Sequence, residues 1–594
     1  MRPYSLLGVL VATLAIVPPA VAAQTAAMNP INPSDTGTTI VLTGKDLTID
    51  EVVAVARRGA KVEYGPAARQ RSLDAYNLLL EGARQSIPIY FFNRGAGSGR
   101  ETVIFEGDAL RPDNEQLLKD RQLASFRRGA RSGVGPEVGE EDIVRAMMVV
   151  RANTMVYESA TPGLSQMLID LINERVTPVV WSRGSPGEGD LPMMSNVAGT
   201  MVGVGDAYWK GERMTAAAAL QRAGLDELEP FAADTAALVS TNAYSAGQAV
   251  LLLYEAKRML DWSDLTFATS MLGLNSSITP LTAVPQNARP FPYQNMQARR
   301  LLNLIRGSYL FDYEVDGGRI IQDPLSFRDY SQRNGALWEA YDRLARNVLI
   351  QINSSDHNPA VVPGTAPSDS WELDTPWLQR YYIEPGPYSE KGGYILSSAN
   401  FVAQPMANDL QALSMALAES LAGSVQRVMR FPDAFFTVIV PADVLSAEVR
   451  AKAPSRGSSW VIADLMAEIQ TLTNPVPAQG LSLVRNVEDM ESYTRQRVAR
   501  ARQAVDIALR LIAQEMLSAS YWVEVRKAQN PARSFGRATE DALASLRTVL
   551  PWQADERPPI PPGEIVYSYM LNNPAADFMG AEEGSMGVAS TPDR

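Results

Sequence analysis

Residues 403–429 read AQPMANDLQALSMALAESLAGSVQRVM, and apolar side chains recur in this stretch every three or four positions. This spacing places them on one face of an α-helix, because one helical turn takes 3.6 residues. The polar side chains between them would face the opposite side. The pattern therefore predicts one long amphipathic helix with a buried stripe made of Met406, Leu410, Leu413, Leu417, Leu421 and Val425.

A second stretch of the same kind covers residues 493–517, YTRQRVARARQAVDIALRLIAQEML. Its apolar stripe consists of Val498, Val505, Leu509, Ile512 and Met516. Both predicted helices are longer than the usual length of about 11–12 residues. Many positions along the stripes are Ala, Ser or Gly, which let neighbouring helices approach closely. We therefore predict a mainly α protein built on a long-helix bundle that also forms the core of an oligomer.

The expected domain boundaries follow from changes in composition along the chain. The segment TTIVLTGKDLTIDEVVAVARRG, beginning at residue 38, predicts a short strand and then a helix capped near Thr48. Compact structure with some α+β character therefore starts there, and the chain after Trp552 is rich in Pro and Gly. The predicted division is a signal peptide at 1–23, a flexible lead at 24–38, an N-terminal active-site domain at 39–240, a central long-helix bundle at 241–530 and a partly disordered C-terminal extension at 531–594.

The N-terminus has the pattern of a secretory signal peptide. Arg2 precedes an apolar run at 6–17, and small residues follow at 20–23. The run is shorter than the roughly 20 residues that a membrane helix needs. The chain has no Cys, which is compatible with an oxidising compartment. We therefore predict a periplasmic or secreted protein without stable membrane insertion.

The composition excludes several kinds of chemistry. A formal net charge of −12 argues against a nucleic-acid partner, because phosphate binding requires a basic face. The absence of Cys excludes thiol catalysis, and the single histidine, His357, excludes a multi-His metal site. Metal binding through carboxylates alone remains open, although no Asp-rich loop with calcium-binding spacing occurs. We predict no metal and no cofactor. His357 lies in a polar turn, where a hydrogen-bonding structural role and a role beside a substrate both remain open.

Six segments in chain order carry a resemblance to a known family. They are IYFFNRGAG at 89–97, VRANTMVYESATPGLSQMLIDLINERVTPVVWSRGSPGEGDLP at 150–192, IQDPLSFRDYSQ at 321–332, INSSDHNPAVV at 352–362, SSANFVAQPMANDL at 397–410 and VRNVEDM at 484–490. In order and spacing they resemble the aromatic amino acid lyase family of histidine and phenylalanine ammonia-lyases. The corresponding family segments read approximately YGVNTGFG, RxNxLxxGxSG followed by GSVGASGDLAPL, QDPYSLR, NSVNDNP, GGNFHGEP and NQEDH.

The resemblance implies a mainly α homotetramer of the ammonia-lyase type, with active sites that combine residues from several subunits. Tyr90 falls on the loop tyrosine that removes a proton β to the substrate carboxylate. Arg328 falls on the arginine that binds this carboxylate, a task suited to a planar guanidinium. Glu488 would be a second acid/base or a ligand for a cationic group. The remaining implied substrate-binding residues are Asn242, Gln322, His357, Asn358, Phe401, Gln404 and Asn486.

The main departure from the family pattern is Glu188 in the turn Gly187-Glu188-Gly189. In the family, an Ala-Ser-Gly segment cyclises there to a methylidene-imidazolone prosthetic group. The nearby Ser185 is followed by Pro186, which has no N–H for this cyclisation. We therefore predict that the electrophile does not form. Glu188 would be a general acid or a carboxylate facing a cationic substrate, although a surface Glu in a Gly turn is also open.

Without the electrophile, elimination requires a substrate with its own good leaving group, such as a quaternary ammonium. The family includes such a branch, the ergothionase-like lyases, which expel trimethylamine from a betaine. The family's second loop tyrosine is also missing, because Leu325 stands at its position. The first interpretation is therefore a lyase acting on a small carboxylate-bearing, cationic substrate by way of Tyr90. The alternatives are a non-catalytic carboxylate-binding protein, and an isomerase or cyclase.

Overall fold

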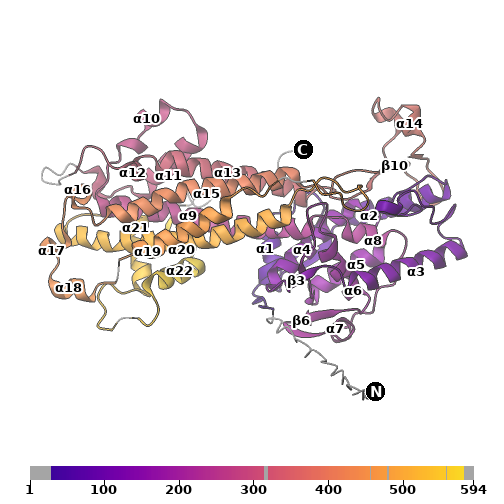
Figure 1. The fold of residues 1–594 in the computed structure, drawn as a ribbon, viewed down its shortest axis with the longest axis horizontal. Coiled ribbons are helices and arrows are strands. Elements are labelled where there is room, and N and C mark those ends of the chain that lie inside the picture. The colour runs from indigo at the N-terminus through magenta and orange to yellow at the C-terminus, as the bar shows by residue number, and fades with distance from the viewer. Residues whose placement is uncertain (1–27, 313–318, 455, 478–479, 557, 581–594) are drawn as a thin grey trace, which may run out of the picture.

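The computed structural model describes residues 28–312, 319–454, 456–477, 480–556 and 558–580. Figure 1 shows an elongated molecule in which a bundle of long helices continues into a globular head. The head holds the N-terminal helices and the small β-sheets, and the bundle holds the longest helices. The predicted signal peptide lies outside the described residues.

The bundle confirms the mainly α prediction. Its long helices are α9 (Ala243–Leu274), α13 (Tyr330–Ile352), α15 (Gln404–Arg430), α19 (Ser459–Thr473) and α20 (Thr494–Gln529). The predicted stripe of α20 is buried at all five positions, and that of α15 is buried except at the half-buried Val425. Burial of these stripes supplies the hydrophobic free energy that holds the helices together.

Helix α9 lies at the centre of the molecule and is buried over most of its length, so it shows no single apolar stripe. The segment Asp234–Leu274 is long and apolar enough to cross a membrane, but 94% of its most apolar window is buried inside the protein. It packs against α20, α4 and α13, as a core helix does.

Shorter helices complete the bundle, and two of them lie in the C-terminal extension. Val566 and Met570 of α22 are buried, and α22 packs against α20. The extension is therefore part of the folded bundle at this point. The shorter helices are α10 (Ala283–Asn287), α11 (Pro292–Leu304), α12 (Leu325–Arg328), α16 (Ala434–Thr437), α17 (Pro441–Val444), α18 (Ala447–Lys452), α21 (Arg537–Arg547) and α22 (Pro562–Asn572).

The head starts as the sequence predicts. Strand β1 (Thr39–Leu42) pairs in parallel with β2 (Lys61–Tyr64), and α1 (Ile49–Arg58) connects them. Thr48 and Glu51 form a reciprocal capping box at the start of α1. The other helices of the head are α2 (Pro66–Arg84), α3 (Pro112–Gly129), α4 (Glu141–Thr154), α5 (Pro162–Asn173), α6 (Leu191–Met201), α7 (Ala216–Ala223) and α8 (Asp234–Val239).

Three small antiparallel sheets and a short helix complete the head. The first sheet pairs β3 with β5, the second has the order β4-β6-β7, and the third has the order β8-β10-β9. Helix α14 (Pro376–Gln379) projects from the third sheet (Figure 1). The strands are β3 (Val134–Glu137), β4 (Val176–Pro178), β5 (Trp181–Arg183), β6 (Asp206–Trp209), β7 (Glu212–Thr215), β8 (Ala360–Pro363), β9 (Tyr382–Ile383) and β10 (Gly393–Leu396).

The described part of the N-terminal lead is docked on the head. The Asn29 N–H donates to the Gly139 carbonyl over 2.7 Å, and the Ile31 N–H donates to the Glu141 carboxylate over 2.8 Å. Met28 is buried. From residue 28 onward the lead is therefore held by backbone hydrogen bonds, which composition alone did not indicate.

The close crossing of α4 and α9 depends on Gly247. A Cβ at this position would lie 2.8 Å from backbone atoms of Ala146 and Met147, which cannot move aside as a flexible side chain can. We expect Gly247→Ala to lower the free energy of unfolding by about 2 kcal/mol, because overpacking outweighs the gain in helix propensity. Thermal unfolding measures this. Gly163→Ala is the control, since its Cβ would meet only ordinary contacts, and equal loss in both variants would contradict the expectation.

Candidate active site

The glycine-rich turn between β5 and α6 is pinned to the segment that precedes α20. The Tyr493 N–H donates to the Pro186 carbonyl over 2.7 Å, and the Ser492 hydroxyl donates to the Gly187 carbonyl over 3.0 Å. Gly187 has a φ of 124°, and a Cβ there would collide with the Ser492 hydroxyl. Glycine is therefore required for this close approach.

The end of the same turn is anchored by the buried Asp190. Its carboxylate accepts the Ser185 hydroxyl and the Ser245 N–H, each over 2.7 Å. The Asp190 N–H donates to the Thr241 carbonyl over 2.5 Å. These contacts fix the turn against the first turn of α9, so the residues between Ser185 and Asp190 have little freedom.

Glu188 projects from the middle of this fixed turn and is half-buried. Its Oε1 is buried and has no hydrogen-bond partner in the described part of the chain. Burial raises the pKa of the Glu188 carboxyl to about 7, and the negative charges of Glu491 and Glu488 add to this effect. A carboxyl group with such a pKa can donate or accept a proton near neutral pH.

Tyr90 lies on a loop that contacts the chain around Glu488. Its hydroxyl oxygen accepts the Gly97 N–H over 3.0 Å. Burial raises the pKa of the Tyr90 hydroxyl, the Gly97 hydrogen bond opposes this, and the charge of Glu488 adds to it. A Cβ on Gly97 would come within 2.8 Å of Val484, so the two loops touch. Tyr90, Glu188 and Glu488 are thus brought together, as predicted residues of one site would be.

The loop that carries Asn486 and Glu488 has an unusual backbone. Val484, Arg485 and Asn486 have φ values of 50°, 56° and 61°, a left-handed conformation that side chains other than glycine rarely adopt. Such conformations are concentrated at functional sites. Burial raises the pKa of the Glu488 carboxyl, and the neighbouring Asp489 adds to the shift. Asn486 is exposed.

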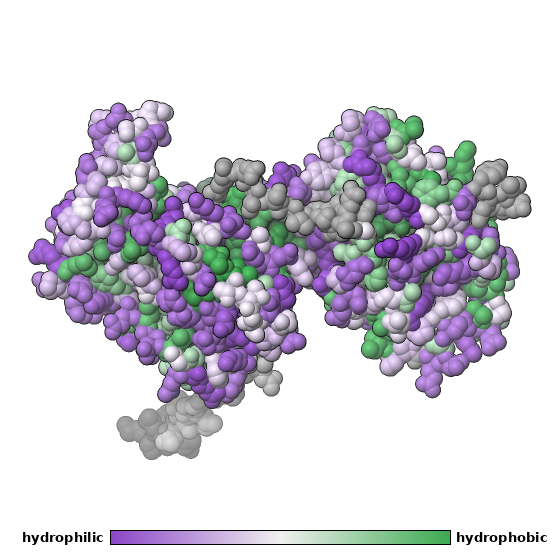
Figure 2. All heavy atoms as spheres, turned by 180° about the vertical axis from the view of Figure 1, so that it is seen from behind, coloured by the Kyte–Doolittle hydropathy of each residue, from purple (hydrophilic) through white to green (hydrophobic). Residues whose placement is uncertain are grey.

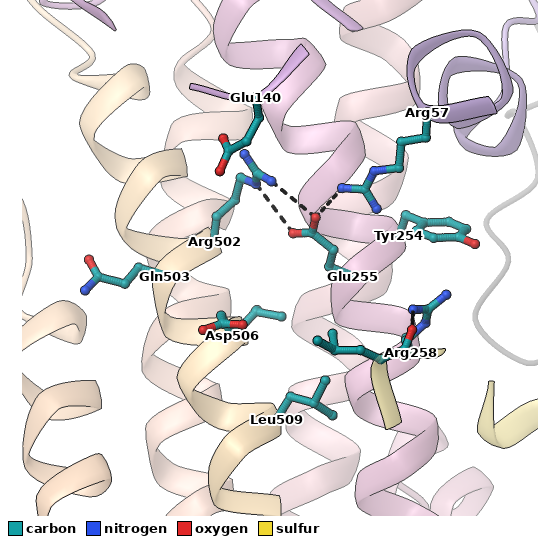
Figure 3. Close-up of a pocket in the computed structure, with 11 residues that line it drawn as sticks. Arg57, Glu140, Tyr254, Glu255, Arg258, Arg502, Gln503, Asp506 and Leu509 are labelled. Carbon is teal, nitrogen blue, oxygen red and sulfur yellow. Dashed lines mark hydrogen bonds and ion pairs between the residues drawn. The ribbon is translucent and has the colours of Figure 1, made fainter. Parts of the chain in front are cut away.

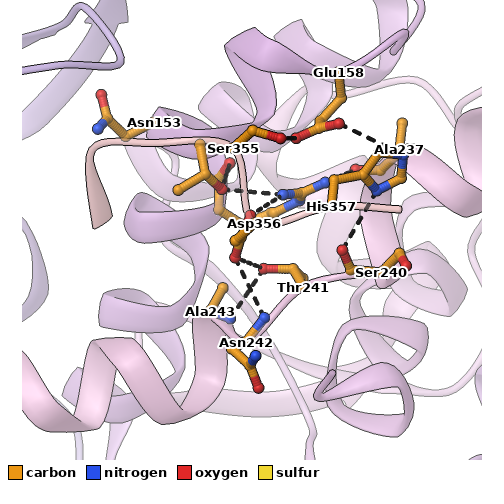
Figure 4. Close-up of polar contacts among 12 residues, drawn as sticks. Asn153, Glu158, Ala237, Ser240, Thr241, Asn242, Ala243, Ser355, Asp356 and His357 are labelled. Carbon is orange, nitrogen blue, oxygen red and sulfur yellow. Dashed lines mark hydrogen bonds and ion pairs between the residues drawn. The ribbon is translucent and has the colours of Figure 1, made fainter. Parts of the chain in front are cut away.

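Asp356 holds the backbone of Asn242 on the side opposite to the Asn242 side chain (Figure 4). The Asp356 carboxylate accepts the Asn242 N–H over 3.3 Å and the Thr241 hydroxyl. It also forms a buried ion pair of 2.8 Å with Arg151 of α4. The Asn242 side chain points away from this cluster, and its buried amide nitrogen and oxygen have no partner among the described residues. Asn242 is itself fully buried, so these two atoms are unsatisfied polar groups in the interior, which a bound ligand group would satisfy.

His357 does not lie where a substrate would touch it, which corrects the expectation of a substrate-binding histidine. The side chain is 1% exposed and packs behind the Asp356 turn, against Glu158. The next residue, Asn358, is half-buried, and its side-chain oxygen accepts the Ser398 N–H over 2.9 Å. Of these two predicted residues, only Asn358 remains accessible.

The other predicted residues lie along the bundle. Half-buried Phe401 and exposed Gln404 lie at the start of α15, on the side of the head. Arg328 ends α12, and its neighbour Phe327 packs against Phe431 just beyond the other end of α15. Because α15 has 27 residues, this end is about 40 Å away from its start. One chain therefore does not bring Arg328 near the residues of the head.

The guanidinium of Arg328 is only partly engaged within the chain. Its Nε donates to the Asp323 carbonyl over 2.6 Å, and in the described ranges its guanidinium forms no ion pair. Gln322 is exposed beside it. Arg328 can therefore offer the other nitrogens of its guanidinium to an anionic group.

Sequence reasoning missed the residues that position the site. Asp356, Arg151 and Thr241 were not identified, although Asp356 directly precedes His357 in the segment that carries the resemblance. Tyr493, which has a φ of 51°, was also missed. Its position next to Glu188 depends on a contact between segments about 300 residues apart, which no local pattern signals.

Three carboxyl groups, those of Glu188, Glu488 and Glu491, lie around this site. Within the ranges that the structure describes, no group of three or more His, Cys, Asp or Glu side chains is placed to hold a metal ion. Both Glu491 oxygens accept the Leu481 N–H, so this carboxylate is already used.

A separate cavity of about 370 Å³ lies between α1, α9, α20 and α22 (Figure 3). Glu255 bridges Arg57 and Arg502 across it, and the Arg258 guanidinium donates to the Leu571 carbonyl. These charged side chains already have partners, so they stabilise the junction of the helices and leave little polar capacity for a ligand.

The surface of the bundle carries exposed apolar side chains. Figure 2 shows apolar areas on both the head and the bundle, among a mostly polar surface. On the bundle, the large exposed side chains of α15 and α19 include Met415, Met429, Trp460 and Val461. This distribution is compatible with contacts to further copies of the chain.

The comparison with solved structures establishes the fold. Ergothionase from Treponema denticola, an ergothioneine-degrading enzyme, has a similar structure with a TM-score of 0.75 and 24% identity, covering 90% of this chain and 99% of that one. Histidine ammonia-lyase from Trypanosoma cruzi also has a TM-score of 0.75, with 19% identity and coverage of 94% and 99%. The protein therefore has the mainly α fold of ammonia-lyases.

The sequence comparisons define the family. Residues 47–548 match the family model described as aromatic amino acid lyase. Histidine ammonia-lyase 2 of Fusobacterium nucleatum is 28% identical over 514 residues, covering 86% of this chain and 91% of that protein. Histidine ammonia-lyase of Gloeobacter violaceus is 29% identical over 527 residues, with coverage of 87% and 93%. The chain belongs to the aromatic amino acid lyase family and is a carbon–nitrogen lyase of the ammonia-lyase type.

The raised pKa of Glu188 makes a testable prediction about stability. A carboxyl group that is harder to ionise in the folded state destabilises the protein as pH rises from the unfolded pKa of about 4.3 toward 7. Glu188→Gln removes this penalty, so we expect the variant to gain on the order of 2 kcal/mol over the wild type across this range. Urea unfolding at several pH values measures it. Glu174→Gln, at the end of α5, is the control, and a pH-independent difference for Glu188→Gln would contradict the assignment.

Proposed function

We propose that the protein eliminates an amine-type leaving group from a small substrate with a carboxylate and a quaternary ammonium group. The observation that carries the proposal is Glu188, a carboxyl side chain in the fixed turn where the family places a cyclising serine. A quaternary ammonium leaves as a neutral amine and needs no electrophilic activation. The fold shared with an ergothionase supports this choice of substrate class.

The residues of the turn do not fit a methylidene-imidazolone. Forming its exocyclic double bond requires loss of a β-hydroxyl from the central residue, and Glu188 has none. The nearest hydroxyl, that of Ser185, is bonded to Asp190, and the next residue is Pro186. No step of the proposed reaction therefore passes through this group.

The proposed reaction uses Tyr90 as the base. In its ionised form the phenolate takes a proton from the carbon β to the carboxylate, the electron pair forms the carbon–carbon double bond, and the carbon–nitrogen bond breaks to release the amine. The Gly97 N–H, which donates to the Tyr90 oxygen, stabilises the phenolate. Glu188 and Glu488 supply negative charge for the cationic group, and Asn242 offers two unpaired polar atoms to the substrate.

We also propose that the active enzyme is a homotetramer. Arg328, the residue proposed to bind the substrate carboxylate, lies about 40 Å from the start of α15 in the same chain. A complete site would therefore take Arg328 and Gln322 from one copy and Tyr90 from another. The exposed apolar side chains of α15 and α19 support contacts of this kind. From the N-terminal sequence we propose that the protein is exported.

The first test is a screen of the purified mature protein with amino acids and their trimethylammonium betaines, with products identified by mass. We expect trimethylamine from a betaine, no ammonia from the parent amino acid, and an intact mass without loss of water. Tyr90→Phe should reduce turnover at least about 100-fold, because the proton acceptor is lost. Tyr293→Phe is the matched control, because this tyrosine lies on α11 in the bundle, where its hydroxyl donates to Asp342 of α13.

Each other outcome of this screen contradicts the proposal. An intact mass lower by two waters would show that the prosthetic group forms. A product of unchanged mass would indicate isomerisation, and stabilisation by the betaine without any product would indicate a binding protein.

A complementation experiment tests the shared site. Tyr90→Phe and Arg328→Ala should each be inactive as homo-oligomers, because each lacks one part of every site. When the two variants are co-expressed, mixed oligomers should recover part of the activity, since some sites combine an intact Tyr90 with an intact Arg328. Mass spectrometry of the intact oligomer confirms mixing. Mixed oligomers without recovered activity would show that both residues act from one chain or not at all.

A further inference from the structure

We propose that Glu158 and His357 form an uncharged pair that shares one proton and positions Asn242 from behind. Both are positioning residues, since neither reaches the open side of the site. The pair belongs to the buried cluster in Figure 4, whichever substrate the enzyme takes.

The geometry brings the two side chains together without solvent. Glu158 is 0% and His357 1% exposed, and the Glu158 Oε2 lies 3.5 Å from the His357 Nε2. In the described residues, Oε2 has no hydrogen-bond partner, so the His357 ring is the group left to satisfy it. The second ring nitrogen, Nδ1, lies 3.4 Å from the Ser240 carbonyl oxygen. The imidazole therefore bridges Glu158, after α4, and Ser240, before α9.

These neighbours determine where the protons are. A carbonyl oxygen can only accept, so the proton on the ring lies on Nδ1 and points to Ser240. The Nε2 of the neutral ring is then an acceptor. Glu158 can bond to it only when its own carboxyl carries a proton, so the pair has the form of a carboxylic acid donating to an imidazole.

The surrounding charges favour this neutral form over an ion pair. Arg151 is 0% exposed and already has Asp356 as its counter-ion. A second buried ion pair would add the cost of desolvating two more charges. Burial raises the pKa of the Glu158 carboxyl, which Arg151 and Arg71 oppose and Asp356 reinforces. Burial and Arg151 lower the pKa of the His357 ring to about 3.

The pair acts on Asn242 through Ser240 and Asp356. The His357 ring holds Ser240, two residues before Asn242, while Asp356, directly before His357, accepts the Asn242 N–H. Without the Glu158 proton, Nε2 would lose its partner and the ring would lose one of its two anchors. The start of α9 would then be less well fixed.

Both residues depart from the family motifs. Glu158 stands at the Gly of RxNxLxxGxSG, and His357 stands at the Asp that precedes Asn-Pro in NSVNDNP. The two departures lie 199 residues apart in the sequence, yet they meet in one buried contact. This is the arrangement expected when one change compensates the other.

The single histidine makes the test direct. In protein labelled with ¹⁵N-histidine, all imidazole signals belong to His357. We expect a neutral ring protonated at Nδ1, with no titration between about pH 5 and 8.5, whereas an ordinary histidine titrates near 6.5. A doubly protonated ring, protonation at Nε2 or titration near pH 6.5 would overturn the proposal.

Two variants test whether Glu158 acts through its proton. Glu158→Gln keeps an N–H donor for Nε2, and Glu158→Met keeps similar volume without a donor. Amide exchange at 238–246 should be unchanged in Glu158→Gln and at least several-fold faster in Glu158→Met, with residues 562–572 as the unaffected internal control. Equal exchange in both variants would overturn the positioning role. The wild type should also lose stability relative to Glu158→Gln as pH rises above about 4.3. Above this pH the Glu158 carboxyl ionises in the unfolded chain but keeps its proton in the folded one, and Gln has no such group.

Discussion

The buried ion pair between Arg151 and Asp356 is the contact on which the rest of the site depends. It joins α4 of the head to the turn before β8, and Asp356 in turn holds Thr241 and Asn242 at the start of the central helix α9. Such a pair is a weak source of net stability, because burying both charges costs about as much as their attraction returns. Losing one partner is costly, however, so the pair fixes one arrangement of three chain segments and excludes others.

The bundle could be predicted from sequence because its helices are half-buried. α15 and α20 each expose one side, so their apolar residues form a stripe with the period of the helix. Helix α9 is buried on all sides and therefore lacks such a stripe, although it is the core of the fold. Helix α22 was hidden for another reason: Pro-rich flanking sequence suggested a coil, while its burial depends on α20, about 50 residues earlier.

The candidate site could be predicted in part. A physical reason separates the residues that the sequence indicated from those that it did not. Tyr90, Glu188 and Glu488 were found from the order of short motifs, and the structure brings them together. His357 was placed beside the substrate because it precedes Asn358 in a segment that resembles a family motif, yet its ring is buried. Solvent exposure and pairing with Glu158 depend on tertiary contacts. The same holds for Asp356 and Tyr493, whose roles come from segments far away in sequence.

Glu188 also accounts for the proton balance of the proposed elimination. Its pKa of about 7 applies to the site without a cation, and a bound quaternary ammonium would lower it, so the carboxylate would be ionised in the complex. When the carbon–nitrogen bond breaks, its electron pair moves to nitrogen and neutralises the positive charge, so the pKa of Glu188 rises again. The group then becomes able to take the proton that Tyr90 has removed from carbon. The rigid turn keeps this carboxyl group in place throughout, because Pro186, Gly187 and Asp190 are all hydrogen-bonded to neighbouring segments. In the proposed reaction, this one side chain thus couples loss of the leaving group to proton uptake.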